Sequence, residues 1–135
     1  MIENIYPSDW QGTRGITSPA KKIDLGNCYM IQVMGIQPDK NENNEAFSDD
    51  IEKQAESVFE NIDKILKACE ASMDDVVKAT IFLTNVDDFK KVSGIRDKWF
   101  AKSKPACTLA EISGLSRKGA KIEIEVMAIL PKENK

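Results

Sequence analysis

The most regular alternation of apolar and polar residues lies in positions 48–72. Apolar side chains recur there every three or four residues, at Ile51, Ala55, Val58, Ile62, Ile65 and Cys69. This spacing places them on one face of an amphipathic helix. Ser48 is the expected N-cap, and Asp49 and Asp50 suit the positive end of the helix dipole.

A second helix is predicted over residues 86–100. Five of its residues share one side of the helix, namely Phe89, Val92, Ile95, Arg96 and Trp99. A stripe of this kind is typical of a helix that packs against a core.

Three segments before residue 85 have the character of strands. Residues 75–84 are rich in β-branched and aromatic residues and are apolar on both faces, which predicts a central strand. Residues 20–25 and 28–34 flank Gly26-Asn27, a turn signal, and predict a hairpin.

Two further strands are predicted near the end of the sequence, over 107–112 and 121–130. The segment between them is rich in glycine and serine, so we expect an antiparallel hairpin. A loop centred near Leu115 places Cys107 opposite Glu123, on one sheet face, and Leu109 opposite Lys121.

The order of these elements predicts an α+β fold for residues 1–135 as a single domain, with both helices on one face of a mixed sheet. In the last strand, Lys121, Glu123, Glu125 and Met127 alternate with apolar residues, so a polar row faces away from the helices. The row fits a solvated sheet face or a ligand cleft, and its spacing leaves both open. We expect a partner subunit to cover this face.

Composition narrows the function classes. The 135 residues are 41% hydrophobic and 30% charged, as in globular proteins, and no apolar run approaches the roughly 20 residues of a membrane span. The first ten residues do not have the pattern of a signal peptide, so we expect a cytoplasmic protein without a membrane partner. A net charge of −3 argues against nucleic acid as a partner.

The sequence contains no histidine, which removes Ser-His-Asp and Cys-His nucleophile activation. Its three cysteines, Cys28, Cys69 and Cys107, are far apart, so neither a disulfide framework nor a metal site is predicted. Cys107 is a nucleophile, a ligand contact or a small strand residue. A facing carboxylate would oppose thiolate formation, which disfavours the nucleophile.

Several runs together resemble one protein family. They are DIEKQAESVFENIDKILKACEASMDDVVKATIFLTNVDDF, then KWF, then Pro105-Ala106, then KIEIEVMAI from Lys121 to Ile129. The chain resembles the Rid/YjgF family of reactive-intermediate deaminases, also called the endoribonuclease L-PSP family, over about residues 23–129. The resemblance implies a chorismate-mutase-like subunit and a homotrimer with a cleft between neighbouring subunits. Deaminating members hydrolyse enamine and imine acids to 2-oxo acids and ammonia without a metal or organic cofactor.

The resemblance also implies site residues. The glutamate that holds the attacking water matches Glu123, and the arginine that clamps the substrate carboxylate is replaced by Cys107. Met34-Gly35 stands where the family often has Ser-Gly, and Ser93 where an asparagine is common. The tyrosine usual before the first strand is missing from residues 18–21.

A neutral thiol cannot supply the bidentate contact of an arginine, so we expect weak binding of small acids and little hydrolysis of 2-aminoacrylate. Arg14 and Arg117 are candidate replacements for the arginine. Two functions follow: a hydrolase of a less anionic small molecule that uses Glu123, or a non-catalytic metabolite-binding or holdase-like protein. An endoribonuclease or translation inhibitor is the weakest alternative, because the chain is acidic and lacks histidine.

Overall fold

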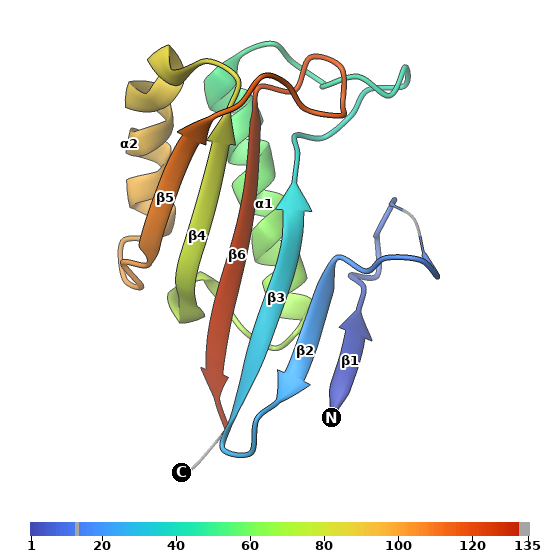
Figure 1. Cartoon of the computed structure of the whole chain (residues 1–135). Helices are drawn as coiled ribbons and strands as arrows, with labels where there is room; N and C mark the ends of the chain where they lie inside the picture. Colours follow the sequence, from blue (N-terminus) through green and yellow to red (C-terminus); the bar gives the residue numbers. More distant parts are fainter. Residues whose placement is uncertain (13, 133–135) are drawn as a thin grey trace.

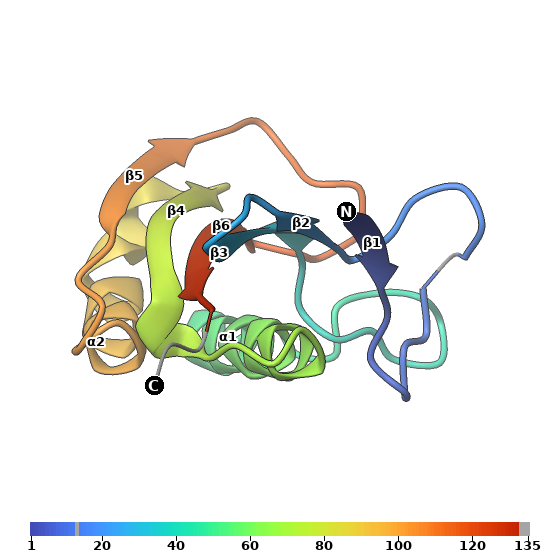
Figure 2. The same ribbon diagram turned by 90° about the horizontal axis from the view of Figure 1, so that it is seen from below.

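The computed structural model describes residues 1–12 and 14–132 as one six-stranded sheet with two α-helices on one of its faces (Figures 1 and 2). The elements in chain order are β1 (Ile2–Ile5), β2 (Ala20–Asp24), β3 (Cys28–Ile36), α1 (Ile51–Ala68), β4 (Val76–Leu83), α2 (Phe89–Trp99), β5 (Ala106–Glu111) and β6 (Ile122–Pro131). Short 3-10 turns, Met73–Asp75 and Val86–Asp88, precede β4 and α2. The predicted α+β class and the placement of both helices are confirmed. Strand β1 was not predicted.

Helix α1 follows the predicted pattern, with its apolar face fully buried against the sheet. The predicted cap was wrong, because the N-cap is Asp50 rather than Ser48. The Asp50 carboxylate accepts hydrogen bonds from the backbone N–H groups of Glu52 (2.8 Å) and Lys53 (3.3 Å). Ser48 lies two residues before the N-cap, and its hydroxyl accepts the N–H of Asp50.

The strand order is β1-β2-β3-β6-β4-β5. The predicted hairpin of β2 and β3 is confirmed, and Gly26 adopts the positive φ of 106° that its tight turn requires. Strand β6 is antiparallel to both β3 and β4, whereas β5 pairs with β4 in parallel.

The predicted antiparallel hairpin of residues 107–112 and 121–130 was therefore wrong. Strand β4 lies between β5 and β6, and the connecting loop passes over the end of β4 (Figure 1). Cys107 lies beside Ala79, and Glu123 beside Phe82, so the two residues do not face each other. The glycines and serines of the loop allow a tight turn but do not require one.

The core fills the space between the sheet and the helices (Figure 2). Phe59 of α1 stacks on Trp99 of α2 with ring centroids 5.8 Å apart, and the ring of Phe100 meets Phe59 edge-on at 5.3 Å. Val92 and Ile95 are buried as predicted, but Phe89 is 41% exposed. Every second residue of β6, from Ile122 to Ala128, is buried, so the predicted polar row faces away from the helices.

Candidate functional site

Glu123 lies on the open face of the sheet, which is the face opposite the helices, between β3 and β4. The register of β3 against β6 shifts between Val33 and Ile36, so Gly35 sits in a bulge next to Glu123. The Glu123 carboxylate lies directly against the α-carbon of Gly35, where any Cβ would overlap Oε2. The absent side chain of Gly35 is therefore what makes room for the carboxylate.

Gln37, just past the end of β3, holds the other carboxylate oxygen. Its Nε2 donates to Oε1 of Glu123 (3.0 Å) and to Oγ of Ser116 (2.9 Å), and its Oε1 accepts the backbone N–H of Arg117 (3.0 Å). No residue that the structure describes donates a hydrogen bond to Oε2 of Glu123. That oxygen is free to accept one from a bound molecule.

The loop that contacts Gln37, residues 113–120, is fixed to the helix layer by Gln54. The side chain of Gln54 is completely buried and donates to the carbonyls of Ser48 (2.7 Å) and Gly119 (2.9 Å). Its Oε1 accepts the N–H of Lys121 (2.8 Å). Helix α1 thus positions the loop that in turn contacts Gln37.

The structure brings three of the six predicted site residues together. Glu123, Gly35 and Met34 are neighbours, and Met34 is 41% exposed next to the bulge. Cys107 is exposed on the edge strand β5 and shares the sheet face of buried Ala79, so within one subunit it lies on the face opposite Glu123.

Ser93 and Arg14 lie apart from Glu123. Ser93 belongs to α2, on the helix side of the sheet, and donates its hydroxyl proton to the Lys90 carbonyl (2.9 Å). Arg14 is exposed and lies over the ring of Tyr6, 4.6 Å from its centroid.

Gln37 was not predicted as a site residue, and Lys78 was not predicted as a cation of the open face. Lys78 of β4 donates to the Thr108 hydroxyl of β5 (2.9 Å). Lys78 faces away from the helices, because buried Ala79 and Ile81 alternate with more exposed neighbours in β4. Nothing in the local pattern indicated the contact of Gln37 with Glu123.

The buried thiol of Cys69 has no part in a reactive site. Burial raises the pKa of Cys69 from its ordinary value of 9.0 to about 11. The thiol therefore stays protonated at neutral pH, and Cys69 is a core residue as predicted. Cys28 is partly buried.

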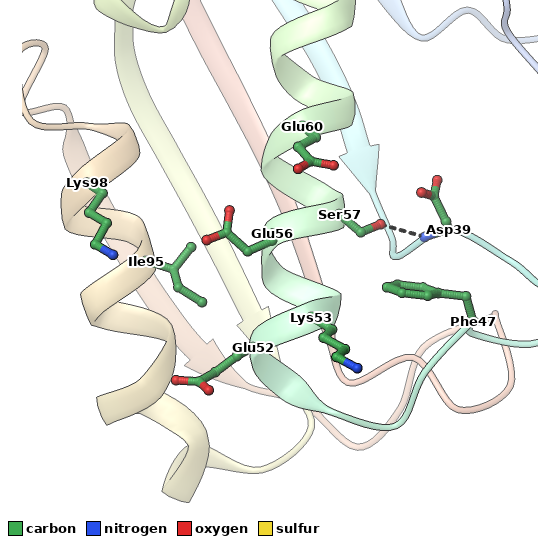
Figure 3. Close-up of a pocket in the computed structure, with 9 residues that line it drawn as sticks. All are labelled: Asp39, Phe47, Glu52, Lys53, Glu56, Ser57, Glu60, Ile95 and Lys98. Carbon is green, nitrogen blue, oxygen red and sulfur yellow. Dashed lines mark hydrogen bonds between the residues drawn. The ribbon is translucent and has the colours of Figure 1, made fainter.

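A hollow of about 490 Å³ lies on the helix side of the molecule, between α1, α2 and the chain before α1 (Figure 3). Its polar groups hold the two helices and that chain together. Ser57 accepts the N–H of Asp39 (2.9 Å), as Figure 3 shows, and Glu56 accepts the indole N–H of Trp99 (3.0 Å). These hydrogen bonds give the polar side chains of the hollow a structural role. No comparable structural role accounts for Glu123.

Within residues 1–12 and 14–132, no cluster of three or more histidine, cysteine, aspartate or glutamate side chains is arranged to hold a metal ion. Neither α-helix of this part of the chain is long and apolar enough to cross a membrane.

Comparison with known proteins gives consistent matches over most of the chain. Residues 22–130 match the family model described as Endoribonuclease L-PSP. A RutC family protein of Pyrococcus abyssi is 38% identical over 109 residues, which cover 81% of this chain and 84% of the relative. Reactive Intermediate Deaminase A, a chloroplastic protein of Arabidopsis thaliana, is 38% identical over 102 residues, which cover 76% of this chain and 52% of the relative.

The fold is shared with solved structures of similar size. The crystal structure of E. coli TdcF with bound serine matches with a TM-score of 0.77 and 26% identity, and the match covers 94% of this chain and 98% of TdcF. Yeast Mmf1 matches with a TM-score of 0.83 and 26% identity over 98% of this chain and all of the other.

Proposed function

Because the chain belongs to the endoribonuclease L-PSP family, also called the Rid or YjgF family, we propose that it hydrolyses small imines or enamines with Glu123 holding the attacking water. Two observations support this. Relatives include a protein named as a reactive intermediate deaminase. In addition, Gln37 fixes one oxygen of the Glu123 carboxylate, and the other oxygen is open to a ligand. This arrangement of the carboxylate is the main support for the proposed reaction.

The reaction needs one proton acceptor beside the imine carbon. Water adds to the C=N carbon of the protonated imine while Glu123 takes a proton from the water, which gives a neutral carbinolamine. Glu123 returns this proton to the nitrogen. The C–N bond then breaks as the hydroxyl group gives its proton back to Glu123, and a carbonyl compound and ammonia leave, with the remaining proton passing to solvent. An enamine first becomes the protonated imine by protonation at carbon.

We propose that the working unit is a homotrimer with the ligand cleft between subunits. The open face is only partly polar, because Met30, Phe82, Met127 and Ile129 are half-buried there and Met34 is 41% exposed. Apolar side chains of this kind on an uncovered sheet face are typical of an interface. Since Cys107 and Glu123 lie on opposite faces of one sheet, a cleft that uses both positions draws them from two subunits.

The substrate class follows from Cys107. A thiol forms no charged pair with a carboxylate, and the loss of a charge-assisted hydrogen bond costs about 1.5–3 kcal/mol, roughly one to two decades in binding. A 2-imino acid would also bring its own negative charge toward Glu123. We therefore propose substrates without a carboxylate, unlike the serine bound to TdcF.

The test compares two imines made in situ: one from benzylamine by a flavin amine oxidase, and one from L-leucine by an amino-acid oxidase. Release of the carbonyl product above the uncatalysed rate is measured for wild type, Glu123→Ala, Cys107→Arg and the control Glu125→Ala, which removes the next carboxylate of the same row. We expect turnover of the benzylamine product by wild type and Glu125→Ala, and none by Glu123→Ala. Cys107→Arg should gain activity toward the leucine product.

Two outcomes contradict the proposal. Equal turnover by wild type and Glu123→Ala would remove Glu123 from the reaction. Robust turnover of the leucine-derived imine by wild type, lost in Glu123→Ala, would show that another group replaces the arginine and that the substrate class is wrong.

The loss of the arginine also supports a second candidate, a non-catalytic metabolite-binding protein that uses the same cleft. A ligand that binds only the folded protein raises its thermal midpoint. Midpoint shifts with small carbonyl and amide compounds, in a protein without imine turnover, would favour this candidate.

A further inference from the structure

We infer that Gln37 is a positioning residue that fixes the Glu123 carboxylate, so that Oε2 is the atom that holds the reacting water. The inference rests on the proposed function for its chemistry but on the geometry alone for the positioning. Nothing in the family resemblance assigned a role to this residue.

The amide of Gln37 can lie in only one orientation. A carboxylate only accepts hydrogen bonds and a backbone N–H only donates, so Nε2 must face Glu123 and Oε1 must face the N–H of Arg117. Both Nε2 protons are used, because the second is donated to Ser116. A rotated amide would place oxygen against carboxylate and lose the hydrogen bonds to Glu123 and to the N–H of Arg117.

The backbone on both sides of this amide is anchored. The Arg117 guanidinium donates to the carbonyl of Pro38, the residue after Gln37, and Pro38 itself is buried. Two contacts thus join the end of β3 to the loop of residues 113–120, one through the Gln37 side chain and one through the Arg117 side chain. The loop is in turn held by Gln54, so Gln37 is not a freely moving surface glutamine.

The consequence for Glu123 is that its two oxygens differ. Oε1 is occupied by Gln37, while Oε2 rests on Gly35 without a donor among the described residues. Without Gln37, the carboxylate would rotate about its last torsion, and the water on Oε2 would lose its fixed distance to the imine carbon. Misplacement of a reacting group by about 1 Å costs on the order of a hundredfold in rate.

Gln37→Met tests this, because methionine keeps the length of the side chain and removes the amide. With the benzylamine-derived imine we expect kcat to fall roughly 10- to 100-fold while KM changes less than about threefold, since substrate does not contact Gln37. The matched control is Asn61→Leu, which removes another amide–carboxylate hydrogen bond (2.8 Å to Asp39) outside the site and should leave both constants unchanged.

Crystal structures of wild type and Gln37→Met separate positioning from catalysis. We expect one Glu123 conformer in wild type, bonded to Nε2 of Gln37, and a displaced or divided carboxylate in the variant. If Glu123→Ala leaves turnover unchanged, the proposed function fails, and the crystal structures still decide the positioning. An unmoved Glu123 in Gln37→Met, or an unchanged kcat where Glu123→Ala is inactive, would overturn the inference.

Discussion

The missing side chain of Gly35 determines where the Glu123 carboxylate lies. The carboxylate occupies the space that a side chain on Gly35 would take. Backbone freedom is not the reason for this glycine, because its φ is not positive. Its role is close approach, which serine or alanine at this position would prevent.

Gly35→Ala should therefore displace Glu123 and reduce imine turnover to the level of Glu123→Ala. Because the new methyl group enters a filled space, we also expect a loss of about 1–3 kcal/mol in the free energy of unfolding. Gly94→Ala is the matched control, since a Cβ at Gly94 in α2 meets no atom within 4 Å. It should raise stability by about 0.5–1 kcal/mol and keep activity. Urea unfolding and turnover assays measure both, and an active Gly35→Ala protein would contradict this account of Gly35.

Part of this site was predictable from the sequence. Glu123 and Gly35 were identified through the family resemblance, and the alternation in β6 gave the correct sheet face for Glu123. Gln37 was missed because its hydrogen bond to Glu123 spans 86 positions, and because a polar residue before a proline has the pattern of an ordinary loop. The placement of Cys107 opposite Glu123 was wrong because it depended on an assumed strand pairing.

At the scale of elements, local patterns predicted both helices and five of the six strands, but not which strands are neighbours. Helical spacing and runs of β-branched residues can be read from neighbouring positions. The position of β6 between β3 and β4 depends instead on contacts between strands that are far apart in the sequence. The exposed strand β1, only four residues long, lacks an alternating pattern.

The contact of α1 with the loop of residues 113–120 is the element-scale feature that most affects the site. Gln54→Leu should lower the free energy of unfolding by about 1–3 kcal/mol, because it leaves a buried N–H and two carbonyls without partners. The control Gln11→Leu removes one exposed hydrogen bond to the Asp9 carbonyl and should change stability little. Denaturant unfolding of both variants decides the point, and equal stabilities would show that the Gln54 contacts do not hold the loop.

At the scale of the whole molecule, the two faces of the sheet differ in what covers them. Helices α1 and α2 cover one face (Figure 2). The other face carries the half-buried Met30 and Met127 and the exposed Met34 together with Glu123. A trimer explains both the apolar content of this face and the separation of Cys107 from Glu123 within one subunit.

Light scattering should therefore give a mass of about 45 kDa for the purified protein, three times the 15.1 kDa of the chain. Met127→Lys, on the open face, should shift the mass toward that of a monomer, because a charge in an apolar interface is costly. Lys90→Glu, on the exposed side of α2, should leave the mass unchanged. A stable monomer at micromolar concentration would exclude a cleft between subunits.

The central place of β6 in the sheet has a consequence for the order in which the protein forms during its synthesis. Among the six strands of residues 1–12 and 14–132, β6 joins the ribbon of β1, β2 and β3 to the pair of β4 and β5, yet it is translated after the other five. Until β6 leaves the ribosome, the earlier strands form two ribbons with unpaired edges that are open to other chains. The sheet therefore closes only once β6 has been made, and Glu123 arrives with the strand that closes it.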